Sequence, residues 1–363
     1  MPTFRADVRE IAPYVPGRPI EDVALEYGFD PADVIKLASN ENPVPPIPSV
    51  RAAMAQMIEK AHRYPDNEAR LLREKLSEVL GVRYEELMIG AGSSEILRVV
   101  AMACGGPGTS AVYGWPSFAV YRLGSVLAMT ERIEVPLDEN RKFDLEAMLA
   151  AIRPDTTLVY LCNPNNPSGT FHPASDVAAF IDAIPERVMV LVDEAYHEFV
   201  TDPSHATALP FAVERPNVLV ARTFSKVHGL ASLRVGYGIS RAENIVELRK
   251  AQAPLSVTAL GQEAALESLK HPDEIAQRIA DNAAGRERLE AGLAELGVHY
   301  IPSQANFVYF RAPAGTETVT KAFLRHRIIL RPFVDGWVRV SVGTPEENSR
   351  FLEAFEVELE TLQ

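Results

Sequence analysis

Apolar residues recur along the first two thirds of the chain with two different periods. One repeats every three to four residues, as on the buried face of a helix, and the other forms short runs rich in β-branched residues, as in buried strands. The first period predicts these helices: Ser49–Ala61, Glu68–Leu80, Ser94–Ala103, Leu145–Ile152 and Ala174–Ile184. The second predicts these strands: Leu87–Ile89, Ser110–Tyr113, Leu158–Leu161, Val188–Val192 and Val218–Ala221. Strands that alternate with helices indicate an α/β fold with a mostly parallel sheet.

The pattern changes after about residue 240. Helical periodicity covers Ala242–Lys270, with an interruption, and then Asp273–Leu296. Three strands and a last helix are predicted after it: Ala305–Phe310, Ile328–Arg331, Trp337–Val342 and Pro345–Leu362. We therefore expect a large α/β domain over 45–240 and a smaller α+β domain over 241–363. The segment 1–44 fits neither pattern, and we expect it to be an arm that packs back on the small domain.

The composition is that of an ordinary soluble globular protein, with 47% hydrophobic and 23% charged residues. No apolar run approaches the roughly 20 residues of a membrane helix, and Met1–Glu10 lacks the apolar core of a secretory signal. The only cysteines, Cys104 and Cys162, lie in apolar stretches, which favours reduced thiols and a cytoplasmic location. A net charge of -13 argues against a nucleic-acid partner.

Polar residues follow several of the predicted strands, at the sheet edge where open α/β folds bind ligands. Asp193-Glu-Ala-Tyr196 follows five apolar residues, and a carboxylate there is costly without a cationic partner. The amide-rich loop Asn163–Gly169 follows the preceding strand. The next strand leads to hydroxyls, Lys226 and Arg234, a set suited to a phosphate and a reactive carbonyl.

A fourth segment, Gly90-Ala-Gly-Ser-Ser-Glu95, leads from a strand into a helix whose N-terminus offers backbone N–H groups to an anion. Each segment alone has an ordinary structural explanation. A strand-end aspartate can cap a helix, an asparagine-rich loop can be a turn, and most lysines are solvated. All four segments at strand ends, in this order, indicate one shared site.

Together these segments resemble the fold-type-I pyridoxal-phosphate (PLP) dependent aminotransferases, most closely the histidinol-phosphate aminotransferase branch. The matching segments span nearly the whole chain: Lys36-Leu-Ala-Ser-Asn-Glu-Asn-Pro43, Arg63-Tyr-Pro-Asp66, Gly90-Ala-Gly-Ser-Ser-Glu95, Cys162-Asn-Pro-Asn-Asn-Pro-Ser-Gly169, Asp193-Glu-Ala-Tyr196, Thr223-Phe-Ser-Lys226, Gly229-Leu-Ala-Ser-Leu-Arg234, Gln304-Ala-Asn-Phe307 and Val338-Arg-Val-Ser-Val-Gly343. The resemblance implies pyridoxal 5'-phosphate as cofactor, an amino donor, a 2-oxo acid acceptor such as 2-oxoglutarate, and a homodimer.

The resemblance also implies roles for residues around the cofactor. Lys226 would carry it as a Schiff base and then move the substrate proton. Asp193 would pair with the pyridine nitrogen, and Asn166 and Tyr196 would bond the phenolic oxygen. Phe118 would lie against the ring, although a core position explains an aromatic residue equally well. The phosphate would be held by this set: Ala91, Gly92, Ser93, Thr223, Ser225 and Arg234.

On the substrate side, the resemblance assigns Arg339 to the anionic tail of the substrate, and Asn166 is also expected to bind the substrate. Arg331 would supplement Arg339, and Tyr14 would lie near a substrate phosphate. A surface salt bridge is the structural alternative for Arg331. The two arginines are eight residues apart in sequence, on separate segments, so a fold must bring them together. No metal site is expected.

Three positions depart from the branch. Val44 replaces a tyrosine that reaches across the dimer interface to the cofactor phosphate, so a charge-assisted hydrogen bond of about 1.5–3 kcal/mol is lost or replaced. Ser94 replaces an acid, and Phe118 a tyrosine. The segments Gly114–Phe118 and Ser303–Phe307 resemble aromatic amino acid aminotransferases of the same branch. Histidinol phosphate is therefore the first expected substrate, with phenylalanine or tyrosine as the alternative.

Two rival classes fit less well. A nicotinamide dehydrogenase needs a third glycine after Gly90-Ala-Gly92, where serine and glutamate stand instead. A PLP-binding regulator would carry a basic DNA-binding module, and this acidic chain has no spare segment for one.

Overall fold

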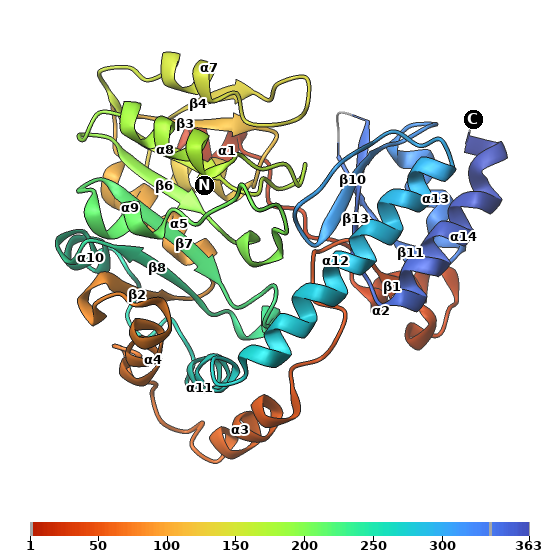
Figure 1. Cartoon of the computed structure of the whole chain (residues 1–363), viewed down its shortest axis with the longest axis horizontal. Coiled ribbons are helices and arrows are strands. Elements are labelled where there is room, and N and C mark those ends of the chain that lie inside the picture. Colours follow the sequence, from red (N-terminus) through yellow and green to blue (C-terminus); the bar gives the residue numbers. More distant parts are fainter. Residues whose placement is uncertain (1–2, 334–335, 363) are drawn as a thin grey trace.

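A seven-stranded sheet forms the centre of the larger of two units in the computed structural model, which describes residues 3–333 and 336–362 (Figure 1). Its strands are β2 (Leu87–Gly90), β3 (Ser110–Trp115), β4 (Glu131–Pro136), β5 (Thr156–Cys162), β6 (Met189–Asp193), β7 (Val218–Thr223) and β8 (Gly236–Ser240). They lie in the order β2-β8-β7-β6-β5-β3-β4, and only the pairings of β8 are antiparallel. The predicted α/β class with a mostly parallel sheet is confirmed.

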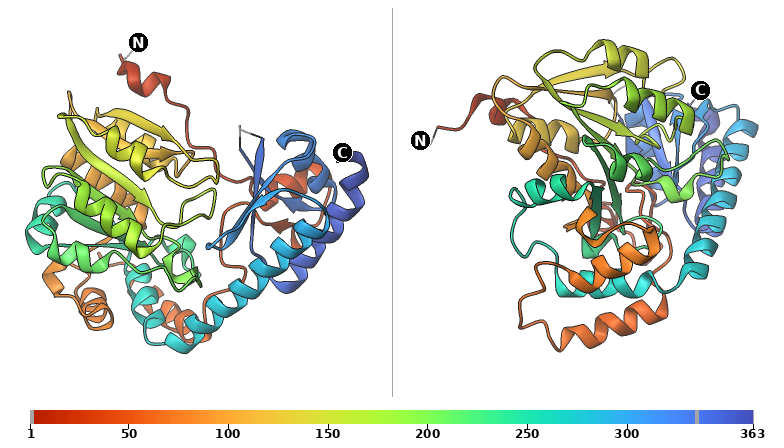
Figure 2. Two further views of the ribbon diagram at one scale, coloured as in Figure 1. Left: turned by 45° about the horizontal axis from the view of Figure 1, so that its top comes forward. Right: turned by 60° about the vertical axis from the view of Figure 1, so that its left-hand side comes forward.

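Helices cover both faces of this sheet (Figure 2). The helices of the larger unit are α3 (Pro48–Ile58), α4 (Arg70–Leu80), α5 (Ser93–Cys104), α6 (Val120–Leu127), α7 (Leu145–Ala150), α8 (Ala174–Ala183), α9 (Leu209–Glu214), α10 (Ala242–Arg249) and α11 (Ala259–Ser268). Among them, α3 packs against α11. The five helices and five strands predicted for this region are all present, with ends shifted by a few residues. No helix in the described residues is both long and apolar enough to cross a membrane.

In the larger unit, sequence patterns did not predict β4, β8, α6 or α9. Strand β4 is an edge strand whose charged residues face solvent, so it lacks the apolar run of a central strand. Strand β8 begins at Gly236, where an added Cβ would lie 2.3 Å from the backbone nitrogen of Ser93. Close approach of a helix to the sheet therefore requires glycine in this strand, and glycine weakens the strand signal in the sequence.

The smaller unit is built on a four-stranded antiparallel sheet in the order β12-β13-β10-β9. Its strands and helices are β9 (Tyr300–Ile301), β10 (Phe307–Arg311), β12 (Arg331–Pro332), β13 (Trp337–Ser341), α12 (Pro272–Glu295), α13 (Thr316–Arg325) and α14 (Pro345–Leu362). The 24-residue helix α12 runs from the larger unit to the smaller one (Figure 1). Apolar residues of α12, α13, α14 and the sheet form a second core.

The strand predicted over Ile328–Arg331 is divided between two sheets. Its first half, β11 (Ile328–Ile329), pairs in parallel with β1 (Ile35–Lys36) of the N-terminal segment. Its second half is β12, which pairs with β13. Because the strand breaks after Ile329, this one apolar run contributes an edge strand to each of two sheets.

The N-terminal segment contacts both units. Helix α2 (Ile20–Tyr27) packs its buried Val23 against Leu324 and Ile329 of the smaller unit. Helix α1 (Ala6–Glu10) instead lies near α6, where the guanidinium of Arg5 donates to the carbonyl of Val126 at 2.6 Å. The segment thus crosses from one unit to the other beside the sheet edge that carries the site.

Candidate active site

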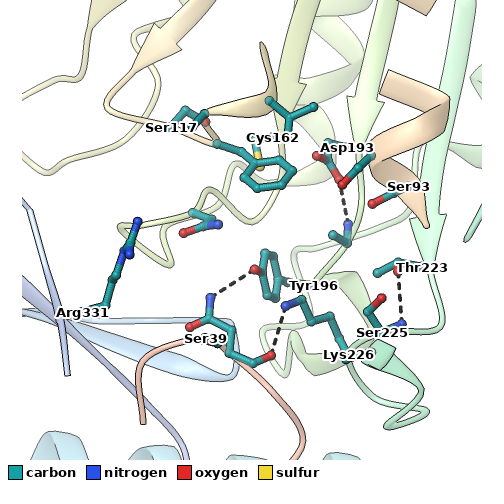
Figure 3. Close-up of a pocket in the computed structure, with 18 of the residues that line it drawn as sticks. Ser39, Ser93, Ser117, Cys162, Asp193, Tyr196, Thr223, Ser225, Lys226 and Arg331 are labelled. Carbon is teal, nitrogen blue, oxygen red and sulfur yellow. Dashed lines mark hydrogen bonds between the residues drawn. The ribbon is translucent and has the colours of Figure 1, made fainter. Parts of the chain in front are cut away.

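A cavity of about 640 Å³ lies at the carboxyl ends of the parallel strands, between the two units (Figure 3). Most of the predicted site residues line it: Tyr14, Ser93, Phe118, Asn166, Asp193, Tyr196, Thr223, Ser225, Lys226, Arg234, Arg331 and Arg339. Parallel strands end at one edge of a sheet, so segments from β2 to β7 converge there. The smaller unit closes the cavity with its two arginines.

Asp193 is the last residue of β6, and only 1% of its surface is exposed. The Tyr121 hydroxyl donates to its Oδ2 at 2.8 Å, and the Ala195 N–H donates to its Oδ1 at 3.2 Å. Burial raises the pKa of this carboxyl to about 6, while the hydrogen bond from Tyr121 lowers it. Both hydrogen-bond donors are neutral, so within the described residues this buried carboxylate has no ion-pair partner at hydrogen-bonding distance.

Lys226 points its amine across the cavity, beside Tyr196 (Figure 3). Its Nζ donates to the carbonyl of Asn40 at 3.0 Å, and the Asn40 amide donates to the Tyr196 hydroxyl at 3.1 Å. Burial and, to a lesser extent, the positive charge of Arg339 lower the pKa of Lys226 to about 7. An amine that is partly neutral near neutral pH can act as a nucleophile and as a base.

The opposite end of the cavity suits an anion. The Arg234 guanidinium donates to the Ser225 hydroxyl at 3.2 Å, and Ser225 N–H donates to the Thr223 hydroxyl at 3.1 Å. Ser93 begins α5, where the helix dipole and free N–H groups attract negative charge. Gly92 has a φ of +71°, and an added Cβ would lie 2.4 Å from Arg234. Only glycine allows this approach.

Arg339 and Arg331 stand directly opposite each other on β13 and β12. The Arg339 guanidinium is buried and donates to the Asn166 side-chain oxygen and, at 2.8 Å, to the Ala38 carbonyl. Burial lowers the pKa of Arg339 to about 10, so it remains charged at neutral pH. Arg331 donates to the Val15 carbonyl at 2.6 Å. The antiparallel pairing brings together two cations that lie eight residues apart in sequence.

The family profile described as aminotransferase class I and II matches residues 32–355. The chain belongs to this family. It is 42% identical over 357 residues to histidinol-phosphate aminotransferase 2 of Ralstonia nicotianae, covering 96% of this chain and 95% of that protein. It is also 42% identical over 353 residues to histidinol-phosphate aminotransferase 1 of Thiobacillus denitrificans, covering 96% and 91%.

A solved structure of histidinol-phosphate aminotransferase from Sinorhizobium meliloti, in complex with pyridoxal-5'-phosphate, has the same fold. Its TM-score to this aminotransferase is 0.91 at 26% sequence identity, over 99% of this chain and 98% of that one. The predicted fold class is therefore confirmed by comparison as well as by topology.

Two predicted residues of this aminotransferase do not line the cavity. The Ala91 N–H donates to the Glu95 carboxylate at 2.6 Å, so it is already engaged. Gly92 lies behind Arg234 and leaves room for that side chain. Within the first turn of α5, Ser93 and Ser94 are the residues that line the cavity.

Two residues at the site were not predicted. Asn40 is buried and joins Lys226 to Tyr196, and its conformation is left-handed, with a φ of +53°. Asn40 belongs to a polar run before the proline-rich linker, and this run was the sequence feature that could have indicated a site residue. Tyr121, which donates to Asp193, gave no such signal. A tyrosine within the apolar helix α6 is expected to be an ordinary core residue, and only the folded structure places its hydroxyl against Asp193.

Phe118 and Val44 take different places. Phe118 lines the cavity, with its ring edge-on to Tyr121 at a centroid distance of 6.0 Å. Val44, where the family has tyrosine, lies outside that cavity and is 42% exposed.

Proposed function

We propose that this protein is a histidinol-phosphate:2-oxoglutarate aminotransferase of histidine biosynthesis, with pyridoxal 5'-phosphate as its cofactor. Relatives that match over nearly the full length are named histidinol-phosphate aminotransferases. The observation that carries the proposal is the pair of facing arginines, Arg331 and Arg339, on the wall of the cavity that holds Lys226. Two guanidinium groups suit a phosphate dianion better than a single carboxylate.

The residues present fit PLP. Asp193 is a buried carboxylate whose hydrogen-bond donors are both neutral, and a protonated pyridine nitrogen would supply the missing cation. Ser93, Ser225 and Arg234 offer donors to the phosphate, and Phe118 offers an aromatic face to the ring. The chemistry of this donor set therefore corresponds to the two ends of the cofactor.

PLP, when bound, supplies a carbonyl that captures amines and a ring that takes up the electrons released from the substrate carbon. Lys226 would hold the cofactor, and its Nζ would accept the proton from the substrate carbon and return it. Its pKa of about 7 leaves much of the amine neutral at neutral pH, which this base role requires.

The remaining residues would orient the cofactor and the substrate and stabilise their charged groups. Asp193 would keep the cofactor nitrogen protonated, and Tyr121 holds the Asp193 carboxylate in place. Tyr196 and Asn166 would bond the phenolic oxygen, and Asn40 bonds both Tyr196 and the amine of Lys226. Arg339 binds the anionic tail of the substrate, and Arg331 and Tyr14 supplement it at a phosphate.

An aromatic amino acid is the second candidate substrate. Trp115, Phe118, Leu123 and Phe333 line the same cavity and offer an apolar surface to a phenyl ring. The carboxylate of phenylalanine needs only one guanidinium, so Arg331 would be dispensable for it.

The deciding experiment compares kcat/KM for histidinol phosphate and phenylalanine, with 2-oxoglutarate as acceptor and PLP-saturated enzyme. We expect a preference of about 100-fold or more for histidinol phosphate, equivalent to about 2.7 kcal/mol of differential transition-state binding. A comparable or greater rate with phenylalanine would make the enzyme an aromatic amino acid aminotransferase.

We also propose that the enzyme is a cytoplasmic homodimer divided into an arm over 1–44, a large domain over 45–240 and a small domain over 241–363. Exposed apolar residues on the arm, including Phe4 and Val15, support an interface with a second copy. Both cysteines are free, which suits a reducing compartment. Light scattering should give twice the chain mass of 39.9 kDa, and a mass equal to one chain would contradict the dimer.

A further inference from the structure

The carboxylate of Glu95 tethers the turn that leads from β2 into α5. Its Oε2 accepts from the Ala91 N–H at 2.6 Å and from the Ser256 hydroxyl at 2.7 Å. Glu95 does not line the cavity that holds Lys226, whereas Ser93 and Ser94 of the same helical turn do. Glu95 therefore holds the turn without facing that cavity itself.

The loop between α10 and α11 fixes this carboxylate in place. Ser256 belongs to the loop, and so does Gln252, whose amide donates to the Ile89 carbonyl of β2 at 2.6 Å. The same amide also donates, over a longer distance of 3.4 Å, to Glu95 Oε2. Because the loop is anchored on β2, it can hold the carboxylate in one position relative to the end of that strand.

The contact differs from an ordinary capping box. There, a glutamate that is the third residue of a helix bonds to the N–H of the residue before the helix, as Glu347 of α14 does with Thr344 at 2.8 Å. Glu95 is also the third residue of its helix, but it bonds to Ala91, one residue before the N-cap Gly92. Gly92 has no side chain that could accept from the first turn, so the N–H groups of that turn stay available to an anion.

The turn needs a tether because its own backbone is permissive. Glycines flank Ala91 on both sides, and Gly92 has a φ of +71°. Glycine loses more conformational freedom on ordering than any other residue, so an untethered turn would lose that freedom when it bound an anion. The hydrogen bond from Ala91 to Glu95 orders the turn before the anion arrives.

We propose that Glu95 is a positioning residue for the phosphate of PLP, because it holds the turn in the conformation that aims the first turn of α5 at that phosphate. Glu95 acts through Ala91 and touches neither the cofactor nor the substrate. The proposal rests on the proposed function, in which Ser93, Ser225 and Arg234 bind the phosphate.

The test compares PLP with pyridoxal, which lacks the phosphate, in titrations of the cofactor-free full-length protein followed by fluorescence quenching. The ratio of the pyridoxal dissociation constant to the PLP dissociation constant measures what the phosphate contributes to binding. Glu95→Ala removes the acceptor, whereas Glu95→Gln keeps an acceptor oxygen and removes the charge. Glu347→Ala is the matched control, because it removes the equivalent contact from α14 and Glu347 does not line the cavity. Urea titrations check that each variant is folded.

We expect the ratio to fall at least about tenfold in Glu95→Ala, equivalent to about 1.4 kcal/mol, while the affinity for pyridoxal changes little. Glu95→Gln should keep the wild-type ratio or exceed it, because the variant no longer repels the phosphate charge. Glu347→Ala should lower the stability and leave the ratio unchanged. The proposal fails if Glu95→Ala keeps the wild-type ratio, or if Glu95→Gln or Glu347→Ala loses as much as Glu95→Ala does.

Two further variants keep the test decisive. Ser256→Ala removes one donor to Glu95 and serves if Glu95→Ala does not fold; the ratio should fall at least about twofold, and an unchanged ratio would overturn the proposal. Arg234→Gln tests the phosphate site itself, and an unchanged ratio there would refute the placement of the phosphate in the proposed function. A lower ratio in Arg234→Gln together with a wild-type ratio in Glu95→Ala would refute the role of Glu95 alone.

Discussion

The hydrogen bond from Tyr121 to Asp193 sets the charge of the carboxylate that we assign to the cofactor nitrogen. Both groups are buried, and the oxygen atoms are 2.8 Å apart. Tyr121→Phe removes only the hydroxyl, and the ring keeps its stacking on Tyr160, with centroids 4.5 Å apart. The substitution therefore isolates one donor to one carboxylate.

The size of the effect follows from the energy of that bond. A hydrogen bond to a charged group contributes about 1.5–3 kcal/mol, and one pKa unit corresponds to about 1.4 kcal/mol. Losing the Tyr121 donor should therefore raise the pKa of Asp193 by about one to two units above its value of about 6 in the cofactor-free protein. At neutral pH, Asp193 would then be mostly protonated and unable to attract the cofactor nitrogen.

The assay is the PLP dissociation constant of cofactor-free enzyme, measured by fluorescence quenching across the pH range. Tyr160→Phe is the matched control, because the Tyr160 hydroxyl is buried without a hydrogen-bond partner among the described residues. Ionisation of PLP itself affects the profiles of the wild type and both variants in the same way, so it does not shift one midpoint relative to another. We expect the affinity midpoint of Tyr121→Phe to move up by about one to two pH units, and that of Tyr160→Phe to stay. Superimposable profiles for the two variants would refute the reasoning.

The remaining predictions concern turnover and stability. Lys226→Ala should give a folded dimer without the visible absorbance of lysine-bound cofactor and without measurable turnover; wild-type activity would disprove the role of Lys226. Arg331→Ala should lower kcat/KM for histidinol phosphate by about 10- to 100-fold, since one charge-assisted bond to phosphate is lost, and should change that for phenylalanine little. Arg325→Ala, an exposed arginine of α13, serves as control, and equal losses on both substrates would contradict the phosphate role. Because burial raises the pKa of Asp193 to about 6, the cofactor-free folded state binds more protons than the unfolded chain between about pH 4 and 6. The Asp193 contribution to the free energy of unfolding should therefore fall as pH rises through this window, and urea titrations of wild type and Asp193→Asn should differ there.

Patterns local in sequence determined most of the fold and the chemistry. The apolar runs ending at Asp193 and Thr223 made strands, because burial on both faces of a parallel sheet leaves few polar positions. The topology of such a sheet then placed the residues after each strand at one edge. The resemblance along the chain identified Lys226, Asp193 and Arg339 as site residues.

Only the tertiary structure decided the contacts between segments far apart in the chain. Tyr121 and Asp193 are 72 residues apart, and no local pattern relates a helical tyrosine to a strand-end carboxylate. Asn40 reaches Tyr196 and Lys226 only because β1 of the arm pairs with β11. Burial depends on packing between elements, and it shifts the pKa of Asp193, Lys226 and Arg339. Sequence therefore determines which residues are present, and tertiary structure decides their partners and the charge of these three groups.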